Sequence, residues 1–165
     1  MRDKWSWFPS KNLCGAGVIF YVLILVRSEI RKKKKDSYDY SNIEPILGDL
    51  IDLVALGTVA DLVKLDFNNR ILVHFGIKQI RSKSCNFGIE AILNLSNKNL
   101  KDIKTSDLSF LIAPKINAAG RLSDMSIGIK CLIAKNKNEA RNYANQLNII
   151  NEERKLVESK MKKEA

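Results

Sequence analysis

Cysteine, histidine and proline are scarce in this sequence, and their scarcity excludes several classes of protein. The 165 residues contain three prolines, one histidine and three cysteines. Cys14, Cys85 and Cys131 lie far apart and form no Cys-x-x-Cys pair. The sequence therefore predicts neither a disulfide scaffold nor a zinc–thiolate site, and isolated cysteines of this kind are typical of the reducing cytoplasm.

Apolar runs long enough to span a membrane are also missing. The longest, residues 13–26, has 14 residues, whereas a span needs about 20. No small-x-small cleavage site follows this run, which argues against a signal peptide. We predict a buried helix here, capped by Ser10 and followed by the basic residues Lys32–Lys35, within an exposed loop that extends to Tyr40. No membrane partner is expected.

Acidic residues are outnumbered, 18 against 28 lysines and arginines, which gives a formal charge of +10. Such a surplus favours a polyanionic partner, nucleic acid above all. An AT-rich coding bias toward lysine produces the same surplus without a function, so both interpretations stay open. The apolar content of 45% excludes disorder of the whole chain and suits one globular domain.

Apolar periodicity predicts a mainly α chain. One helix starts near Pro45 and is interrupted at Gly57. Further helical patterns cover residues 68–80, 88–95, 108–113 and 125–134, the third of them stopped by Pro114. From Asn138 almost to the end, the pattern predicts one helix of roughly 25 residues that becomes charged all round in its last third.

Few residues are candidates for chemistry, since the chain has no nucleotide-binding glycine loop, HExxH or GxSxG motif. His74 lies inside a helical pattern and is predicted to be a packing or surface residue. Asp61 is surrounded in sequence by apolar residues, and a buried carboxylate must be paired, hydrogen-bonded or bound to a cation. Capping of a turn is the alternative for Asp61, and the residues alone do not decide between them.

The segment Asn117-Ala118-Ala119-Gly120-Arg121 is the second candidate. Small residues allow a backbone to approach an anion, Gly120 allows a positive φ, and Arg121 offers a planar fork for phosphate. The alternative is a tight turn between helices with an exposed arginine, and the residues alone favour that alternative.

Four segments resemble one known family in order and spacing. Residues 52–63, Asp-Leu-Val-Ala-Leu-Gly-Thr-Val-Ala-Asp-Leu-Val, resemble the fourth motif of the DHH phosphoesterase family, in the form found in its single-strand-specific 5′→3′ DNA exonucleases. Residues 8–18, 68–73 and 113–126 resemble other segments of the same enzymes. Together the segments extend over most of the chain.

The resemblance implies two-metal hydrolysis of single-stranded DNA from its 5′ end, with Mn²⁺ or Mg²⁺ as cofactor. It implies that Asp61 is a metal ligand and thereby a catalytic residue. It further implies that the segment containing Asn117, Gly120 and Arg121, with Lys115 just before it, binds the phosphates of the strand.

The resemblance also implies that the chain is a fragment. The family's first three motifs, including Asp-His-His, would precede Met1, and its DHHA1 and OB domains would follow Ala165. Residues 1–135 would then be the later part of an α/β catalytic domain, and residues 136–165 a truncated helix that connects two domains. A fragment of this kind is expected to be inactive alone, with a separately encoded N-terminal half as a candidate partner. A non-enzymatic basic helical module that binds nucleic acid, or a degenerate gene remnant, are the alternatives.

Overall fold

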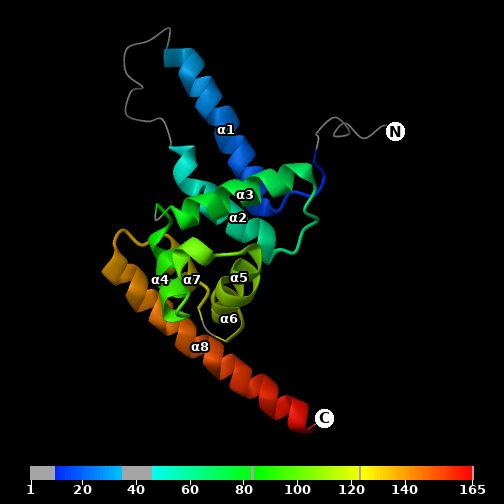
Figure 1. The fold of residues 1–165 in the computed structure, drawn as a ribbon, viewed down its shortest axis with the longest axis vertical. Helices are drawn as coiled ribbons and strands as arrows, with labels where there is room; N and C mark the ends of the chain where they lie inside the picture. Colours follow the sequence, from blue (N-terminus) through cyan, green and yellow to red (C-terminus); the bar gives the residue numbers. More distant parts are fainter. Residues whose placement is uncertain (1–9, 35–45, 83, 123, 165) are drawn as a thin grey trace. The chain divides into compact units, whose positions relative to one another are not determined.

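The structure, a computed structural model, describes residues 10–34, 46–82, 84–122 and 124–164 (Figure 1). All regular elements within these ranges are helices, and these ranges contain no strand. The prediction of a mainly α chain is thereby confirmed. The chain divides into two compact units, residues 1–78 and residues 79–165.

The first unit is built from α1 (Gly15–Lys34), a 3₁₀ turn at Leu47–Leu50, α2 (Ile51–Ala60) and most of α3 (Phe67–Arg81). Helix α1 packs against α2. The centre of this unit is a cluster of four buried side chains from these elements: Phe20, Leu47, Val54 and Leu72. Burying such side chains is the main term that stabilises a fold of this size.

Helix α1 is buried along one face only, so the prediction of a buried helix holds for that face and is wrong for the rest of the helix. Phe20 is 8% exposed, whereas Ile19 is 59% and Leu25 67% exposed. Ser10 does not cap α1, since its hydroxyl donates to Asp66. The helix also extends into the predicted basic loop as far as Lys34, and residues 35–45 lie outside the described part. No helix in the described ranges is long and apolar enough to cross a membrane.

Two glycines allow the helices of this unit to approach closely. Gly57 lies inside α2 and does not interrupt it, contrary to the prediction; a Cβ there would lie 2.8 Å from Ala16 Cβ on α1. A Cβ on Gly76 of α3 would lie 2.3 Å from Ala55 Cβ and 2.6 Å from the carbonyl oxygen of Ile51. Both positions therefore require a residue without a side chain.

The second unit packs three shorter helices against one long helix. Helices α4 (Phe87–Leu95), α6 (Ala113–Leu122) and α7 (Ser126–Leu132) each contact α8 (Lys137–Glu164) (Figure 1). Helices α3, α4 and α7 correspond to the patterns predicted at 68–80, 88–95 and 125–134. Helix α8 has 28 residues, close to the predicted length of roughly 25. The fully buried side chains of this unit include Ile89, Ile92, Leu93, Ile103, Leu108, Ile112, Cys131 and Leu147.

Pro114 does not stop a helix, which corrects a second prediction. The chain runs from α5 (Thr105–Asp107) through a π-helical segment, Leu108–Ile112, directly into α6. The backbone N–H of Ala113 donates to the carbonyl oxygen of Leu108, five residues earlier. The π-helical turn shifts the backbone hydrogen bonds by one residue, so that Pro114 lies in the first turn of α6. Proline is tolerated there, because N–H groups in the first turn of a helix have no partner within that helix.

Candidate functional site

Asp61 lies at the end of α2, where its backbone N–H donates to the carbonyl oxygen of Gly57 at 3.0 Å. Its side chain is exposed, so the expectation of a carboxylate buried among apolar residues is wrong. The apolar neighbours Leu56 and Val59 face the core from within the helix, whereas Asp61 is the residue that follows its last turn. Asp61 therefore occupies the position directly after the C-terminal end of α2.

The residue after Asp61 has an unusual backbone. Leu62 has a φ of 53°, in the left-handed region that branched and bulky residues rarely adopt, and its side chain is 83% exposed. Its N–H donates to the carbonyl oxygen of Val59 at 3.3 Å. The turn that follows α2 is therefore held in a strained conformation next to the candidate metal ligand.

Asp61 has no set of further ligands within the described ranges. No group of three or more His, Cys, Asp or Glu side chains in these ranges lies close enough together to hold a metal ion. The second carboxylate of the same motif, Asp52, is fully buried in the first turn of α2, where its Oδ1 accepts the N–H of Leu53 at 2.7 Å. The described residues alone therefore do not fit a two-metal centre.

Two segments that carry the family resemblance are joined by hydrogen bonds in the first unit. Asp66, just before α3, accepts the hydroxyl of Ser10 at 2.8 Å and the amide of Asn12 at 3.1 Å. The fully buried amide of Asn69 donates to the carbonyl oxygens of Asn12 and Lys64, both at 2.8 Å. These bonds fix the segment before α1 against the start of α3.

The Asp66 carboxylate is stabilised in its charged form by the same contacts. The backbone N–H of Asn69, followed by the side chains of Asn12 and Ser10, holds the pKa of Asp66 below its ordinary value of 3.8. Sequence analysis missed Asp66. An aspartate directly before an amphipathic helix is a recognisable N-terminal cap, so the signal was present.

The segment Asn117–Arg121 is helical and not a turn, which corrects the prediction. It lies within α6, with Ala118 and Ala119 buried, and Asn117 and Gly120 exposed. No described glycine has a positive φ, so Gly120 serves a different purpose: a Cβ there would lie 2.4 Å from Cε of Met125. Arg121 is in the last turn of α6, and its side chain lies outside the described part of the structure.

Lys115 is buried, with 8% of its surface exposed. Its Nζ donates to Oγ of Ser96 at 3.0 Å, which joins α6 to the residue that follows α4. Burial lowers the pKa of Lys115, the neighbouring charge of Lys155 lowers it further, and Glu152 opposes both. This placement suits a residue that positions α6.

A groove of about 240 Å³ borders the exposed side of this segment. Pro114, Asn117 and Ala118 of α6 line it together with Arg154 of α8. Arg154 forms an ion pair with Glu158 and a long hydrogen bond, 3.5 Å, to Oδ1 of Asn151. Sequence analysis did not single out Arg154, because its role depends on where α8 packs.

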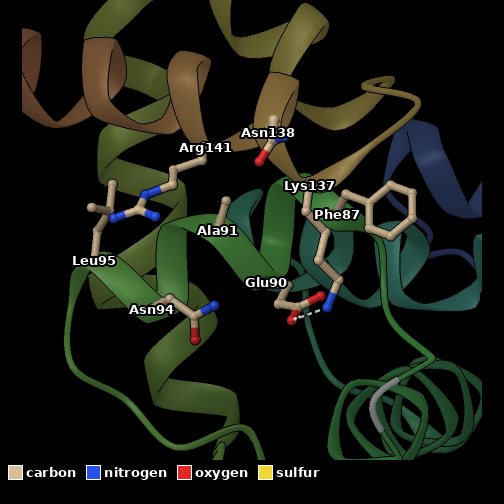
Figure 2. Close-up of a pocket in the computed structure, with 8 residues that line it drawn as sticks. All are labelled: Phe87, Glu90, Ala91, Asn94, Leu95, Lys137, Asn138 and Arg141. Carbon is tan, nitrogen blue, oxygen red and sulfur yellow. Dashed lines mark hydrogen bonds and ion pairs between the residues drawn. The ribbon is translucent and has the colours of Figure 1, made fainter.

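A larger groove of about 360 Å³ lies elsewhere on the second unit, between α4 and the start of α8 (Figure 2). Glu90 and Lys137 form an ion pair of 2.8 Å across it, and this pairing raises the pKa of Lys137. Figure 2 shows the Arg141 side chain extending toward the Leu95 end of α4. None of the predicted site residues lines this groove.

Similar proteins and similar solved structures lead to the same enzyme. The chain is 48% identical over 159 residues to the single-stranded-DNA-specific exonuclease RecJ of Salmonella typhimurium and 47% identical to that of Escherichia coli, in each case over 96% of this chain. The crystal structure of Thermus thermophilus RecJ in complex with Mg²⁺ matches 94% of the chain with a TM-score of 0.78 and 28% identity. No protein-family model matches the chain.

The predicted resemblance to RecJ is confirmed. A second Thermus thermophilus RecJ structure, in complex with Mn²⁺, matches 89% of the chain with a TM-score of 0.74. The chain spans 27% of the length of the Salmonella and Escherichia coli RecJ relatives. It is therefore similar, over nearly all of its own length, to a segment of RecJ that is about a quarter of that enzyme.

Proposed function

We propose that this chain contributes part of the catalytic domain of a RecJ-like exonuclease that hydrolyses single-stranded DNA from its 5′ end in recombination and repair. The observation that carries the proposal is the 48% identity to a RecJ exonuclease over 96% of the chain. Residues 1–135 would belong to the catalytic domain, and residues 136–165 would form the helix that leads to the next domain. A reducing cytoplasm is the proposed compartment.

In this proposal Asp61 is one ligand of a divalent-ion centre. Asp61 is exposed at the end of α2, and carboxylate oxygen is the ligand that Mg²⁺ and Mn²⁺ prefer. Such ions, held by Asp61 together with ligands from other residues, would supply an activated water and would neutralise charge on the phosphate. The remaining ligands would come from other residues, and a separately encoded N-terminal half is the proposed source.

The strand would be bound by α6. Arg121 would contact a phosphate and Asn117 would offer a neighbouring amide, while Gly120 leaves room for Met125. Lys115 would act indirectly, because it is buried and held by Ser96. Binding through phosphates implies a strong dependence of affinity on salt.

Digestion of 5′-labelled single-stranded DNA in Mn²⁺ tests the catalytic part of this proposal. We expect no activity from the purified chain alone, and activity after addition of the N-terminal segment of the Escherichia coli relative, which is 47% identical to this chain where the two align. Asp61→Asn should lower the reconstituted rate at least about 100-fold, because essential members of a catalytic unit act together. Asp49→Asn, at another exposed aspartate of the same unit, is the control.

Nuclease activity of the chain alone that is abolished in Asp61→Asn would show that the chain holds a complete metal centre. Fluorescence anisotropy with a labelled single strand tests the strand-binding part. Arg121→Ala should weaken binding by about 1–3 kcal/mol, the range for one charge-assisted contact. Unchanged affinity in that variant would remove Arg121 from the strand-binding surface.

A non-enzymatic module that binds nucleic acid is the second candidate function. The formal charge of +10 favours it, because a basic chain binds single strands without any catalytic centre. This candidate would be supported if the chain binds single strands but shows no nuclease activity in any mixture with the N-terminal segment.

A further inference from the structure

Arg154 lies next to the part of α6 that the proposed function assigns to strand binding. It shares a groove of about 240 Å³ with Asn117, although the two residues belong to different helices. Helix α8 packs on α6 within the second unit, so this placement follows from the packing of the two helices. The side chain of Arg154 is 21% exposed, which leaves it accessible from the groove.

The guanidinium of Arg154 is held in place before any ligand arrives. Its Nη1 pairs with Glu158, and its Nη2 is 3.5 Å from Oδ1 of Asn151, a residue that is itself 2% exposed. A side chain fixed in this way loses less conformational entropy when it binds an anion than a free surface lysine does. Arg154 is therefore a preorganised donor.

Hydrogen-bonding capacity remains on this guanidinium. The group carries five N–H donors, and its contacts with other described residues are the two to Glu158 and Asn151. The remaining donors suit the oxygens of a phosphate, which arginine binds through two parallel hydrogen bonds.

Arg154 is the charged residue among those that line the groove. Lys155 and Lys115 are close enough for the charge of Lys155 to lower the pKa of Lys115. Glu152 pairs with Lys155 at 2.9 Å, and Glu158 pairs with Arg154. Lys155 thus has its own carboxylate partner and Lys115 is buried and held by Ser96, so Arg154 is the cation that the groove offers to an anion.

We propose that Arg154 binds a phosphodiester group of single-stranded DNA in this groove, with the Asn117 amide as a second donor. Helix α8 is then part of the strand-binding surface in addition to its packing role. This inference rests on the proposed function, because it extends the strand contact of α6 onto a second helix.

The competing explanation is that Arg154 only stabilises α8 through its ion pair with Glu158, four residues away. Four variants of the full chain separate the two explanations: Arg154→Ala, Arg154→Lys, Glu158→Gln and Arg141→Ala. Arg141 is an exposed arginine of the same helix that lines the other groove, so it matches the change in charge. The readouts are anisotropy of a labelled single strand at several salt concentrations and thermal melting by circular dichroism.

We expect Arg154→Ala to weaken strand binding about tenfold. The slope of the logarithm of affinity against the logarithm of salt concentration should become shallower by about one unit, because one phosphate contact is lost. Arg154→Lys keeps the charge but loses the planar guanidinium, so it should recover part of the affinity. Arg141→Ala also removes one positive charge, yet it should stay within about twofold of the unmodified chain. Glu158→Gln removes the carboxylate that pairs with Arg154 and should bind at least as tightly as the unmodified chain. A loss of affinity in Glu158→Gln equal to that in Arg154→Ala would overturn the inference in favour of the ion pair.

The failure of this inference is distinguishable from failure of the proposed function. Equal losses in Arg154→Ala and Arg141→Ala would show a nonspecific effect of charge and would overturn the inference. Full affinity in Arg154→Ala with weakened binding in Arg121→Ala would also overturn it while supporting strand binding by α6. Full affinity in both variants would contradict the strand-binding role of α6 as well.

Discussion

The carboxylate of Asp66 and the hydroxyl of Ser10 are 2.8 Å apart, although 56 residues separate them in the chain. The other oxygen of Asp66 accepts the backbone N–H of Asn69 at 2.9 Å, which satisfies one of the free donors at the start of α3. One side chain thus closes the beginning of a helix and fixes the segment that leads into α1.

We expect Asp66→Asn to unfold at a lower temperature than the unmodified chain at pH 7, because it removes the charged acceptor of three hydrogen bonds. The folded state lowers the pKa of Asp66 below 3.8, so its contribution to stability is present above that pH and is lost as the pH falls through the lowered value. The difference in melting temperature between the two proteins should therefore shrink below about pH 4. A difference that is unchanged at pH 3 would contradict this account, and Asp49→Asn is the matched control.

Gly76 of α3 lies directly against residues of α2. Alanine there would place its Cβ 2.3 Å from Ala55 Cβ and 2.6 Å from the carbonyl oxygen of Ile51. Alanine is the better helix former, but the steric cost of its Cβ at this position should exceed the gain in helix propensity. We therefore expect Gly76→Ala to lower the free energy of unfolding by about 1–3 kcal/mol in urea titrations. Gly15→Ala is the control, since no atom lies within 4 Å of its added Cβ. Equal stability of both variants would show that α2 and α3 can separate without loss.

Helices with a clear apolar stripe were predictable from the sequence, whereas the effects of single glycines and prolines were not. The patterns that became α3, α4, α7 and α8 all have one buried face that recurs at helical spacing. The intrinsic propensities of Gly57 and Pro114 predict interruptions of a helix at both positions. Tertiary packing overrides propensity at Gly57, which faces Ala16, and the π-helical turn accommodates Pro114.

The sequence names candidate site residues, but it does not predict where the structure places them. Asp61 has apolar neighbours in sequence, yet it is exposed, because burial depends on where α2 ends. The segment that starts at Asn117 has the composition of a turn but is helical, and its residues Ala118 and Ala119 are buried in the core. Arg154 could not be found from local pattern at all, because only the packing of α8 on α6 brings it to Asn117.

Lys115 offers a test of whether a residue of the strand-binding segment acts directly or through position. Burial lowers the pKa of Lys115, so folding disfavours its charged form, and this penalty disappears as the pH rises above the ordinary value of 10.5. We expect Lys115→Met to have an equal or higher urea midpoint than the unmodified chain at pH 7, with the difference shrinking toward pH 10.5. Lys101→Met, at an exposed lysine, should change neither the urea midpoint at pH 7 nor its dependence on pH.

The same Lys115→Met variant should keep its affinity for single-stranded DNA within about twofold, because a buried Nζ cannot reach a phosphate without displacement of its neighbours. Ser96 would remain satisfied, since its hydroxyl also donates to the carbonyl oxygen of Ile92 at 3.1 Å. A loss of affinity comparable to that of Arg121→Ala would show that Lys115 contacts the strand directly.

Leu62 carries strain that a single substitution should relieve. Its φ of 53° disfavours a bulky residue such as leucine by about 1–2 kcal/mol, and its side chain, 83% exposed, contributes little burial in return. Glycine adopts this conformation freely, although it also gives the unfolded chain more freedom, so we expect Leu62→Gly to raise the free energy of unfolding by about 0.5–1 kcal/mol. Asn97→Gly is the matched control: Asn97 has a φ of 51°, but asparagine tolerates this region, so its gain should be smaller. Urea titration of the two variants beside the unmodified chain measures both gains. A destabilised Leu62→Gly would mean that the leucine side chain holds the turn after Asp61 through contacts that outweigh its backbone strain.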